Sequence, residues 1–430
     1  MEKKYFLYLF FYFLFFSPLQ VFSQDISGKP DLNALSPDHI FSENIKTFIL
    51  QPEGTQFALP LITLGSDNKL ELKFDELGIE NKHYKYNFVY CNAEWDATEL
   101  PVSDYISGFA EGDITQVTFS RNTLIDYCHY SLQFPEQSTQ FILPGNYLIV
   151  VYADDTKDKP IIIAHFYVVE SQLTIDAKVQ RATLLENSNT HQEISFSLHT
   201  SNYLISNPYQ NLKIYIYQNQ RFDNRISGIQ PQMVVGNTID YTFNEDISFE
   251  GGNEFRNFDT KDFRYQSPGT RKIEKDSLYI ITLASDKKKP FQVYESQKDI
   301  NGNFLIKSND AYDNDTEADY CIVVFTLPAD VPYLSGNVYI FGGLTQWQLQ
   351  DNAKMQYNAK EKAYKGNLLL KQGYYNYQYL FVDTDGKAGT AAIEGNHFET
   401  ENNYTIFVYY REPGSYADKL IGFKSINNLF

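Results

Sequence analysis

Hydrophobic and polar residues alternate along several short stretches of the chain. In residues 69–74, Leu70, Leu72 and Phe74 alternate with three charged residues, and residues 84–90 repeat the pattern with aromatic side chains. Successive side chains of a strand point to opposite faces, so each stretch predicts a strand with one buried face. The same alternation, or a denser apolar run, recurs in residues 146–152, 161–169, 194–199, 213–217, 239–243 and 374–382.

Turn residues separate these predicted strands. Pro144-Gly145 stands directly before one of them, and Asp385-Gly386 follows another in the manner of a hairpin. No long stretch shows the 3.6-residue period of an amphipathic helix. The sequence therefore predicts an all-β fold, made of tandem immunoglobulin-like or early-set β-sandwich domains with little helix.

The length of 430 residues corresponds to about three domains. Shifts in composition suggest where each unit begins and ends. The expected units are a signal peptide (1–23), an N-terminal arm (24–44), β-sandwich domain 1 (45–170), β-sandwich domain 2 (171–308), an acidic linker (309–319), an early-set-like β-sandwich domain 3 (320–411) and a C-terminal tail (412–430).

The first residues have the order of a secretory signal. A short charged start is followed by the apolar run 5–16 and by the small residue Ser23. The alternative is an N-terminal membrane anchor, but the run is shorter than the roughly 20 residues that span a bilayer. No later segment reaches that length, so we expect an exported protein without direct membrane insertion.

The charge balance narrows the possible partners. Lys and Arg number 36 against 54 Asp and Glu, which gives a formal net charge of -18. Binding to nucleic acid or to anionic lipid depends on clustered basic residues. We therefore expect no nucleic-acid partner and no docking through a basic patch.

No motif in the sequence predicts catalysis. The seven His are scattered, and the sequence lacks a nucleophile elbow, a zinc-protease motif and a phosphate-binding loop. Residues 313–319 resemble a calcium loop, but Ala318 and Val324 stand where Gly and Glu are needed. We expect a solvated linker there, and we predict no catalytic residue, no cofactor and no metal site, hence no enzyme. A hydrolase would have only the abundance of carboxylates in its favour.

The three cysteines are too far apart in the sequence to suggest a metal site. Cys91 and Cys128 lie in the expected first domain and Cys321 in the third. A bridge between Cys91 and Cys128 is compatible with the sequence, although buried free thiols are the favoured interpretation.

One irregular stretch, residues 249–275, combines aromatic residues with arginine. These residue types are enriched in the centres of protein interfaces. The alternative is an ordinary loop that packs on its own domain. The candidate partner contacts are Phe255, Arg256, Phe258, Phe263 and Arg264.

The expected third domain resembles the early-set sandwich modules that flank starch- and glycogen-acting enzymes. The resemblance lies in residues 338–347 and 373–379 and implies that Trp347 stacks on a sugar. Gln378 carries no charge where the modules have a cation, and Lys387 stands after the hairpin where a second Trp is expected. Packing of Trp347 is therefore favoured, and an exported glycan-binding protein is the alternative function.

A wider resemblance covers most of the mature chain. Five blocks in order resemble the plug proteins of the type IX secretion system, namely residues 84–95, 103–109, 251–256, 373–379 and 394–402. The resemblance implies a non-enzymatic periplasmic protein, peripherally associated with the outer membrane. Its implied partner is the outer-membrane translocon barrel of that system. The resemblance implies that the protein occludes the periplasmic opening of the barrel while the translocon is idle.

Overall fold

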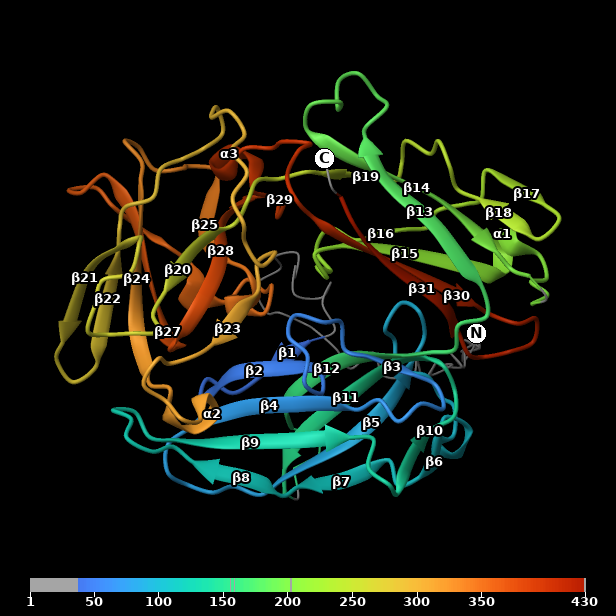
Figure 1. Cartoon of the computed structure of the whole chain (residues 1–430), viewed down its shortest axis with the longest axis horizontal. Coiled ribbons are helices and arrows are strands. Elements are labelled where there is room, and N and C mark those ends of the chain that lie inside the picture. The colour runs from blue at the N-terminus through green and yellow to red at the C-terminus, as the bar shows by residue number, and fades with distance from the viewer. Residues whose placement is uncertain (1–37, 155, 158, 202, 429–430) are drawn as a thin grey trace, which may run out of the picture.

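The computed structural model describes residues 38–154, 156–157, 159–201 and 203–428. These residues form three β-sandwich domains around a common centre (Figure 1). Strands account for 47% and helices for 5%, so the all-β prediction is confirmed. The expected signal peptide, 1–23, and most of the expected arm, 24–44, lie outside the described residues.

Domain 1 comprises the described residues up to 170. One sheet contains β1 (His39–Ile40), β3 (Leu61–Thr63), β5 (Tyr84–Cys91), β7 (Glu111–Ile114), β11 (Gly145–Ala153) and β12 (Pro160–Val169). The facing sheet contains β2 (Ile45–Pro52), β4 (Leu70–Leu77), β8 (Gln116–Phe119) and β9 (Tyr127–Phe134). A short helix η2 (Val102–Asp104) precedes a separate pair, β6 (Ile106–Gly108) and β10 (Thr139–Phe141).

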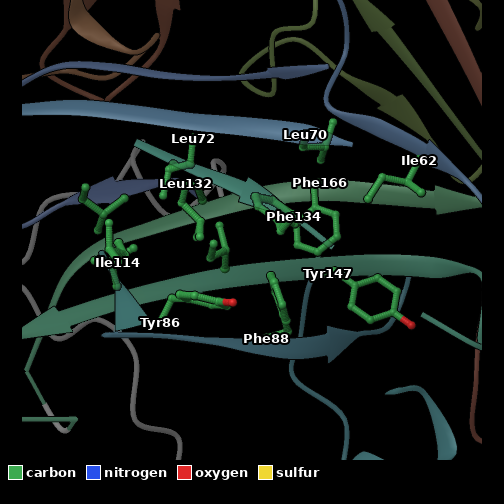
Figure 2. Packing of buried hydrophobic residues seen from close by; sticks show 14 of the residues in the cluster. Ile62, Leu70, Leu72, Tyr86, Phe88, Ile114, Leu132, Phe134, Tyr147 and Phe166 are labelled. Atoms are coloured by element: carbon green, nitrogen blue, oxygen red, sulfur yellow. The ribbon is translucent and has the colours of Figure 1, made fainter. Parts of the chain in front are cut away.

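The core of domain 1 explains why the alternating stretches form strands. Leu70 and Leu72 of β4 point inward and meet Phe88 of β5 and Phe166 of β12 between the two sheets (Figure 2). Burial of each such side chain stabilises the fold by about 1.5–3 kcal/mol.

Domain 2 is built from two separate parts of the chain. Its first sheet contains β13 (Thr174–Arg181), β14 (His191–His199), β17 (Met233–Val235), β18 (Thr238–Asp240) and β19 (Ser248–Glu250). Its second sheet contains β15 (Leu212–Gln218), β16 (Ile226–Ser227), β30 (Asn403–Tyr410) and β31 (Lys419–Asn427), with α1 (Pro208–Asn211) preceding β15.

Domain 3 lies between these two parts in the sequence. One sheet contains β20 (Arg256–Asp259), β23 (Phe304–Ile306), β25 (Gly336–Phe341), β28 (Gly373–Asp383) and β29 (Ala388–Gly389). The other contains β21 (Thr270–Lys275), β22 (Tyr279–Leu283), β24 (Tyr320–Pro328), β26 (Gln356–Asn358) and β27 (Ala363–Lys371). Short helices are α2 (Asn314–Glu317), η3 (Gly343–Thr345), η4 (Asp351–Ala353) and α3 (Ala391–Glu394).

The strand pairing departs from the expected boundaries. β30 pairs with β15 and with β31, so the expected third domain, 320–411, and tail, 412–430, both contain strands of domain 2. Conversely, the expected second domain, 171–308, contains β20 to β23, which belong to domain 3. Domain 3 is thus an insertion into domain 2, and the chain crosses between them twice.

One predicted strand is shorter than expected. Ile239 and Tyr241 are buried as the alternation predicts, but Phe243 is 78% exposed. The backbone turns there, because Phe243 has a left-handed conformation with φ of 55°. The alternating pattern therefore ends two residues early.

The insertion makes a testable prediction about residues 412–428. Their deletion removes β31 and leaves an open edge on β30, so we expect domain 2 to unfold and the protein to become insoluble. Soluble expression and circular dichroism measure this outcome. Tyr416→Ser, at an 82% exposed position of the same segment, is the matched control and should fold normally. A soluble, folded deletion variant would contradict the assignment of β31 to domain 2.

Candidate functional site

Buried polar groups gather where the domains meet. Within the described ranges, no three His, Cys, Asp or Glu side chains are grouped so that they could hold a metal ion. No helix in this part of the chain is long and apolar enough to cross a membrane. The interfaces are named after the domains that they join: 1–3, 1–2 and 2–3.

The 1–3 interface is centred on Asp75 of β4. This carboxylate is fully buried and accepts hydrogen bonds from Lys371 Nζ at 2.6 Å and from Tyr320 Oη at 2.7 Å, both of domain 3. Its other oxygen lies 2.7 Å from His129 Nδ1 of domain 1. A domain 1 carboxylate is therefore surrounded by partners from two domains.

Lys371 is the buried cation of this cluster, only 1% exposed. Its ammonium lies 4.1 Å from the centre of the Tyr127 ring and also donates to the carbonyl of Asp315 at 2.7 Å. Burial lowers the pKa of Lys371, and the Asp75 charge opposes that shift. Separating the domains would leave an unpaired charge on each side, which a low-dielectric surface tolerates poorly.

The second half of the expected acidic linker, 309–319, is part of this interface, whereas Asp310 and Tyr312 in its first half are exposed. Asp313 caps α2 by accepting the N–H of Asp315, and Asp315 forms an ion pair with Lys73 at 2.9 Å. Asp319 is buried and accepts the backbone N–H of Leu124 at 2.9 Å. The carboxylates that resemble calcium ligands are thus directed toward protein donors.

The 1–2 interface contains a second buried carboxylate, Asp418. It accepts two hydrogen bonds from Arg411, at 2.8 and 2.6 Å, one from Lys213 at 3.1 Å and one from the N–H of Ala93 at 3.0 Å. Burial raises the pKa of Asp418, but these donors outweigh that effect and hold the pKa below its ordinary value. Ala93 comes from domain 1, so this carboxylate also joins two domains.

Aromatic rings fill the rest of the 1–2 interface. Tyr167 of domain 1 stacks on Phe407 of domain 2 with ring centres 4.4 Å apart. Trp95 meets Tyr167 and Phe222 edge-on, at 5.3 and 6.0 Å. The end of the block 84–95 therefore packs between domains.

At the 2–3 interface the two crossing segments, 251–255 and 395–402, lie against each other. Gly251 approaches the carbonyl of His397 so closely that a Cβ there would lie 2.0 Å from the oxygen, which only glycine allows. Asn402 Nδ2 donates to the carbonyl of Gly251 at 2.9 Å. Two blocks that are far apart in the sequence thus form one contact.

Arg256 and Glu394, which adjoin the crossing segments 251–255 and 395–402, are bonded to each other in domain 3. Arg256 is 8% exposed, and its Nε lies 3.0 Å from both carboxylate oxygens of Glu394, while Nη1 lies 2.9 Å from Asp286. Burial lowers the pKa of Arg256, but the two carboxylates outweigh it and raise the pKa overall.

The five candidate partner residues differ in their burial. Phe255 and Phe258 are buried, and Arg256 is engaged as described. Phe263 is partly buried and stacks on Tyr279 with ring centres 4.3 Å apart. Arg264, with 59% of its side chain exposed, is the best exposed of the five and pairs with Asp262 and Asp310. The alternative, a segment packing on its own domain, describes the other four.

Trp347 is partly buried by protein side chains. Its ring meets Phe255 and Phe341 edge-on at 5.9 and 5.4 Å, and the guanidinium carbon of Arg221, from domain 2, lies 5.4 Å from the ring. A Cβ at Gly302 would lie 2.2 Å from the ring. This geometry favours the packing interpretation of Trp347 over sugar stacking.

The three cysteines are buried free thiols in the described chain, so Cys91 and Cys128 are not joined. Burial raises the pKa of Cys91 to about 12, which makes its thiolate scarce at neutral pH.

Substitution of Lys371 tests the 1–3 interface. Lys371→Met leaves Asp75 buried without its cation, and we expect a loss of about 3–5 kcal/mol in the free energy of unfolding. Adding Asp75→Asn should recover part of that loss, because the uncompensated charge is removed. Urea unfolding measures both effects. Lys365→Met, which breaks the exposed pair with Glu361, is the control and should cost about 1 kcal/mol or less.

Arg256 and Arg264, which both lie in residues 249–275, provide a second test. Arg256→Ala leaves Glu394 and Asp286 unpaired and should lower stability by about 3–5 kcal/mol. Arg264→Ala is the matched control and should leave the melting temperature unchanged. Differential scanning fluorimetry compares them. Equal melting temperatures for the two variants would show that the Arg256 cluster contributes no more than a surface pair.

The first domain of the chain matches a known protein family. The family described as "Type 9 secretion system plug protein 1st domain" matches residues 45–170, which correspond to domain 1. No curated protein matches the chain.

A crystal structure of a hypothetical protein from Parabacteroides merdae is similar over all three domains. It shares 38% sequence identity and has a TM-score of 0.88, over 91% of this chain and 99% of that chain. An alkylpurine DNA glycosylase from Pseudomonas fluorescens (11% identity, 31% of this chain and 30% of that chain, TM-score 0.17) also matches. So does the collagen adhesin of S. aureus (10% identity, 89% and 91% coverage, TM-score 0.12). Neither of these two scores indicates a shared fold. With its first domain matched by the family description, the chain belongs to the type IX secretion system plug protein family.

Proposed function

We propose that the protein is a non-enzymatic periplasmic plug. In this proposal it is exported by its signal peptide and binds the outer-membrane translocon barrel of the type IX secretion system. It occludes the periplasmic opening of that barrel while the translocon is idle. Membership of the plug family supports the general role.

The observation that carries the proposal is the paired burial of charge at the domain interfaces. A stopper must keep its shape while it blocks an opening and when it is released. Asp75 and Lys371 connect domains 1 and 3 through charges that cannot be exposed singly without cost, and Asp418 accepts the Ala93 N–H across the 1–2 interface. Three domains held in this way form one wide body. A formal charge of -18 keeps such a body soluble after release.

Arg264 is the proposed point of contact with the partner. Of the five candidate contacts, Arg264 is the one with a largely exposed side chain. We retain it as the candidate contact, because Arg at an interface centre pairs strongly with carboxylates.

Deletion of the protein tests the proposed function. Cells that lack it, with the translocon idle, should become permeable to a large antibiotic such as vancomycin, and the wild-type gene should restore the barrier. Lys371→Met should restore it poorly because the interface is weakened. Unchanged permeability, together with no copurification of the tagged chain with the translocon, would contradict the plug role.

A further inference from the structure

The connection between β22 and β23 carries two apolar side chains that protrude into solvent. Phe291 is 99% exposed and Val293 is 93% exposed. Scattered exposed apolar residues are common on protein surfaces, whereas adjoining ones that protrude together mark contact surfaces. Gly, Pro and small polar residues usually occupy turns, so an aromatic ring in this place needs a reason. We call residues 284–298 the Phe291 loop.

The backbone presents the Phe291 ring from a turn. The N–H of Gln292 donates to the carbonyl of Lys289 at 3.0 Å, which closes a turn with Pro290 and Phe291 at its two central positions. Proline fixes its own φ, so this turn is favoured before any partner binds. An aromatic side chain that is already in place loses little conformational entropy on binding.

Two contacts hold the base of this turn on the body of domain 3. The N–H of Lys289 donates to the carbonyl of Ile393 in α3 at 2.7 Å. The carbonyl of Lys287 accepts a hydrogen bond from Arg256 Nη2 at 2.7 Å, and Arg256 belongs to the buried cluster with Glu394. Figure 1 shows α3 at the end of domain 3 that lies away from domain 1, so the Phe291 loop is held at that end.

The Phe291 loop is basic although the chain is acidic. Its charged residues are four lysines and two carboxylates, namely Lys287, Lys288, Lys289, Lys298, Asp286 and Glu295. Asp286 is directed inward, because it lies 2.9 Å from Arg256 Nη1 and accepts two tyrosine hydroxyls. Lys287 is exposed, and the ammonium of Lys288 lies 4.5 Å from the centre of the Tyr333 ring. The overall charge balance, from which we expected no docking through a basic patch, does not reveal this local excess.

These side chains define the chemistry of a complementary partner. Phe is enriched at the centres of interfaces and Lys is depleted there, so the ring suits an apolar pocket and the lysines suit its rim. Lysines on a rim attract carboxylates and steer association. A nucleic acid or an anionic bilayer is a poor match, because such a polyanion extends over the rest of a surface whose formal charge is -18. The matching partner is a protein surface with an apolar pocket bordered by carboxylates.

We propose that the Phe291 loop anchors the protein to the periplasmic rim of the translocon barrel, at an apolar pocket bordered by carboxylates. Phe291 and Val293 enter the pocket, and Lys287 pairs with its acidic border. This inference rests on the proposed function and adds a second contact to it. Arg264 pairs with Asp310, shortly before α2, at the end of domain 3 that adjoins domain 1. The two contacts thus lie at opposite ends of domain 3, as expected for a body that spans an opening and meets its rim on both sides.

Biolayer interferometry between the full mature chain, residues 24–430, and the purified, detergent-solubilised translocon barrel tests the anchor. Phe291→Ser should weaken the affinity by about tenfold or more, as is usual when a central aromatic residue of an interface is truncated. Its melting temperature should equal that of the wild type, because the ring is almost fully exposed. Phe243→Ser, at a 78% exposed position of domain 2, is the matched control and should bind normally.

Charge reversal tests the acidic border of the pocket. Lys287→Glu should slow association at about 50 mM salt, and the difference from the wild type should shrink at about 300 mM salt, because salt screens exposed charges. Lys178→Glu, at an exposed position of β13, changes the net charge by the same amount and should associate at the wild-type rate.

The outcomes separate this inference from the proposed function. If the wild-type chain binds the barrel and Phe291→Ser binds equally well, the Phe291 anchor is overturned while the plug role stands. If the wild-type chain does not bind the barrel, both are overturned. Sedimentation velocity of the chain alone should show a monomer. Self-association that Phe291→Ser abolishes would identify a second copy of the chain as the occupant and would overturn the contact with the barrel.

Discussion

A charge that is buried at a domain boundary must keep its partner, and the arrangement of this molecule depends on that constraint. Asp75 belongs to domain 1, while Lys371 and Tyr320, which bond to it, belong to domain 3. Asp418 belongs to domain 2 and holds the backbone of domain 1 at Ala93. Opening the 1–3 interface would leave an unpaired ion in a poorly hydrated surface, which costs several kcal/mol. At the 1–2 interface Asp418 would keep Arg411 and Lys213 and would lose its hydrogen bond from the Ala93 N–H. The domains are therefore coupled more strongly than their short connections alone would require.

Much of the fold could be predicted because one face of a strand is buried, so that apolar residues recur at every second position in the sequence. Residues 69–74 and 84–90 show it and form β4 and β5. The insertion of domain 3 could not be predicted, because the pattern of residues 403–410 specifies a strand but not its neighbour. β30 pairs with β15, nearly 200 residues away in the sequence, and no local feature records this. Strand register across domains depends on long-range packing, which periodicity does not encode.

The candidate site was harder to predict for a related reason. The sequence does not distinguish a charged residue that is buried against a partner from one that is exposed to water. Asp75, Lys371 and Asp418 therefore could not be identified as interface residues from the sequence. Residues 249–275 have the Arg and Phe content of an interface, but composition does not show that Phe255, Arg256 and Phe258 are buried within the chain. The blocks 84–95, 251–256 and 394–402, which carried the family resemblance, mark these interfaces. Ala93 contacts domain 2, and Gly251 and Asn402 join the two segments that cross between domains 2 and 3.

Differential scanning calorimetry of the mature chain tests the coupling of the domains most directly. A body joined by paired buried charges should unfold as one unit, with a single heat-absorption peak whose calorimetric and van't Hoff enthalpies agree. Two or three separable peaks, each with the enthalpy of one sandwich, would mean that the domains melt independently and would contradict the account.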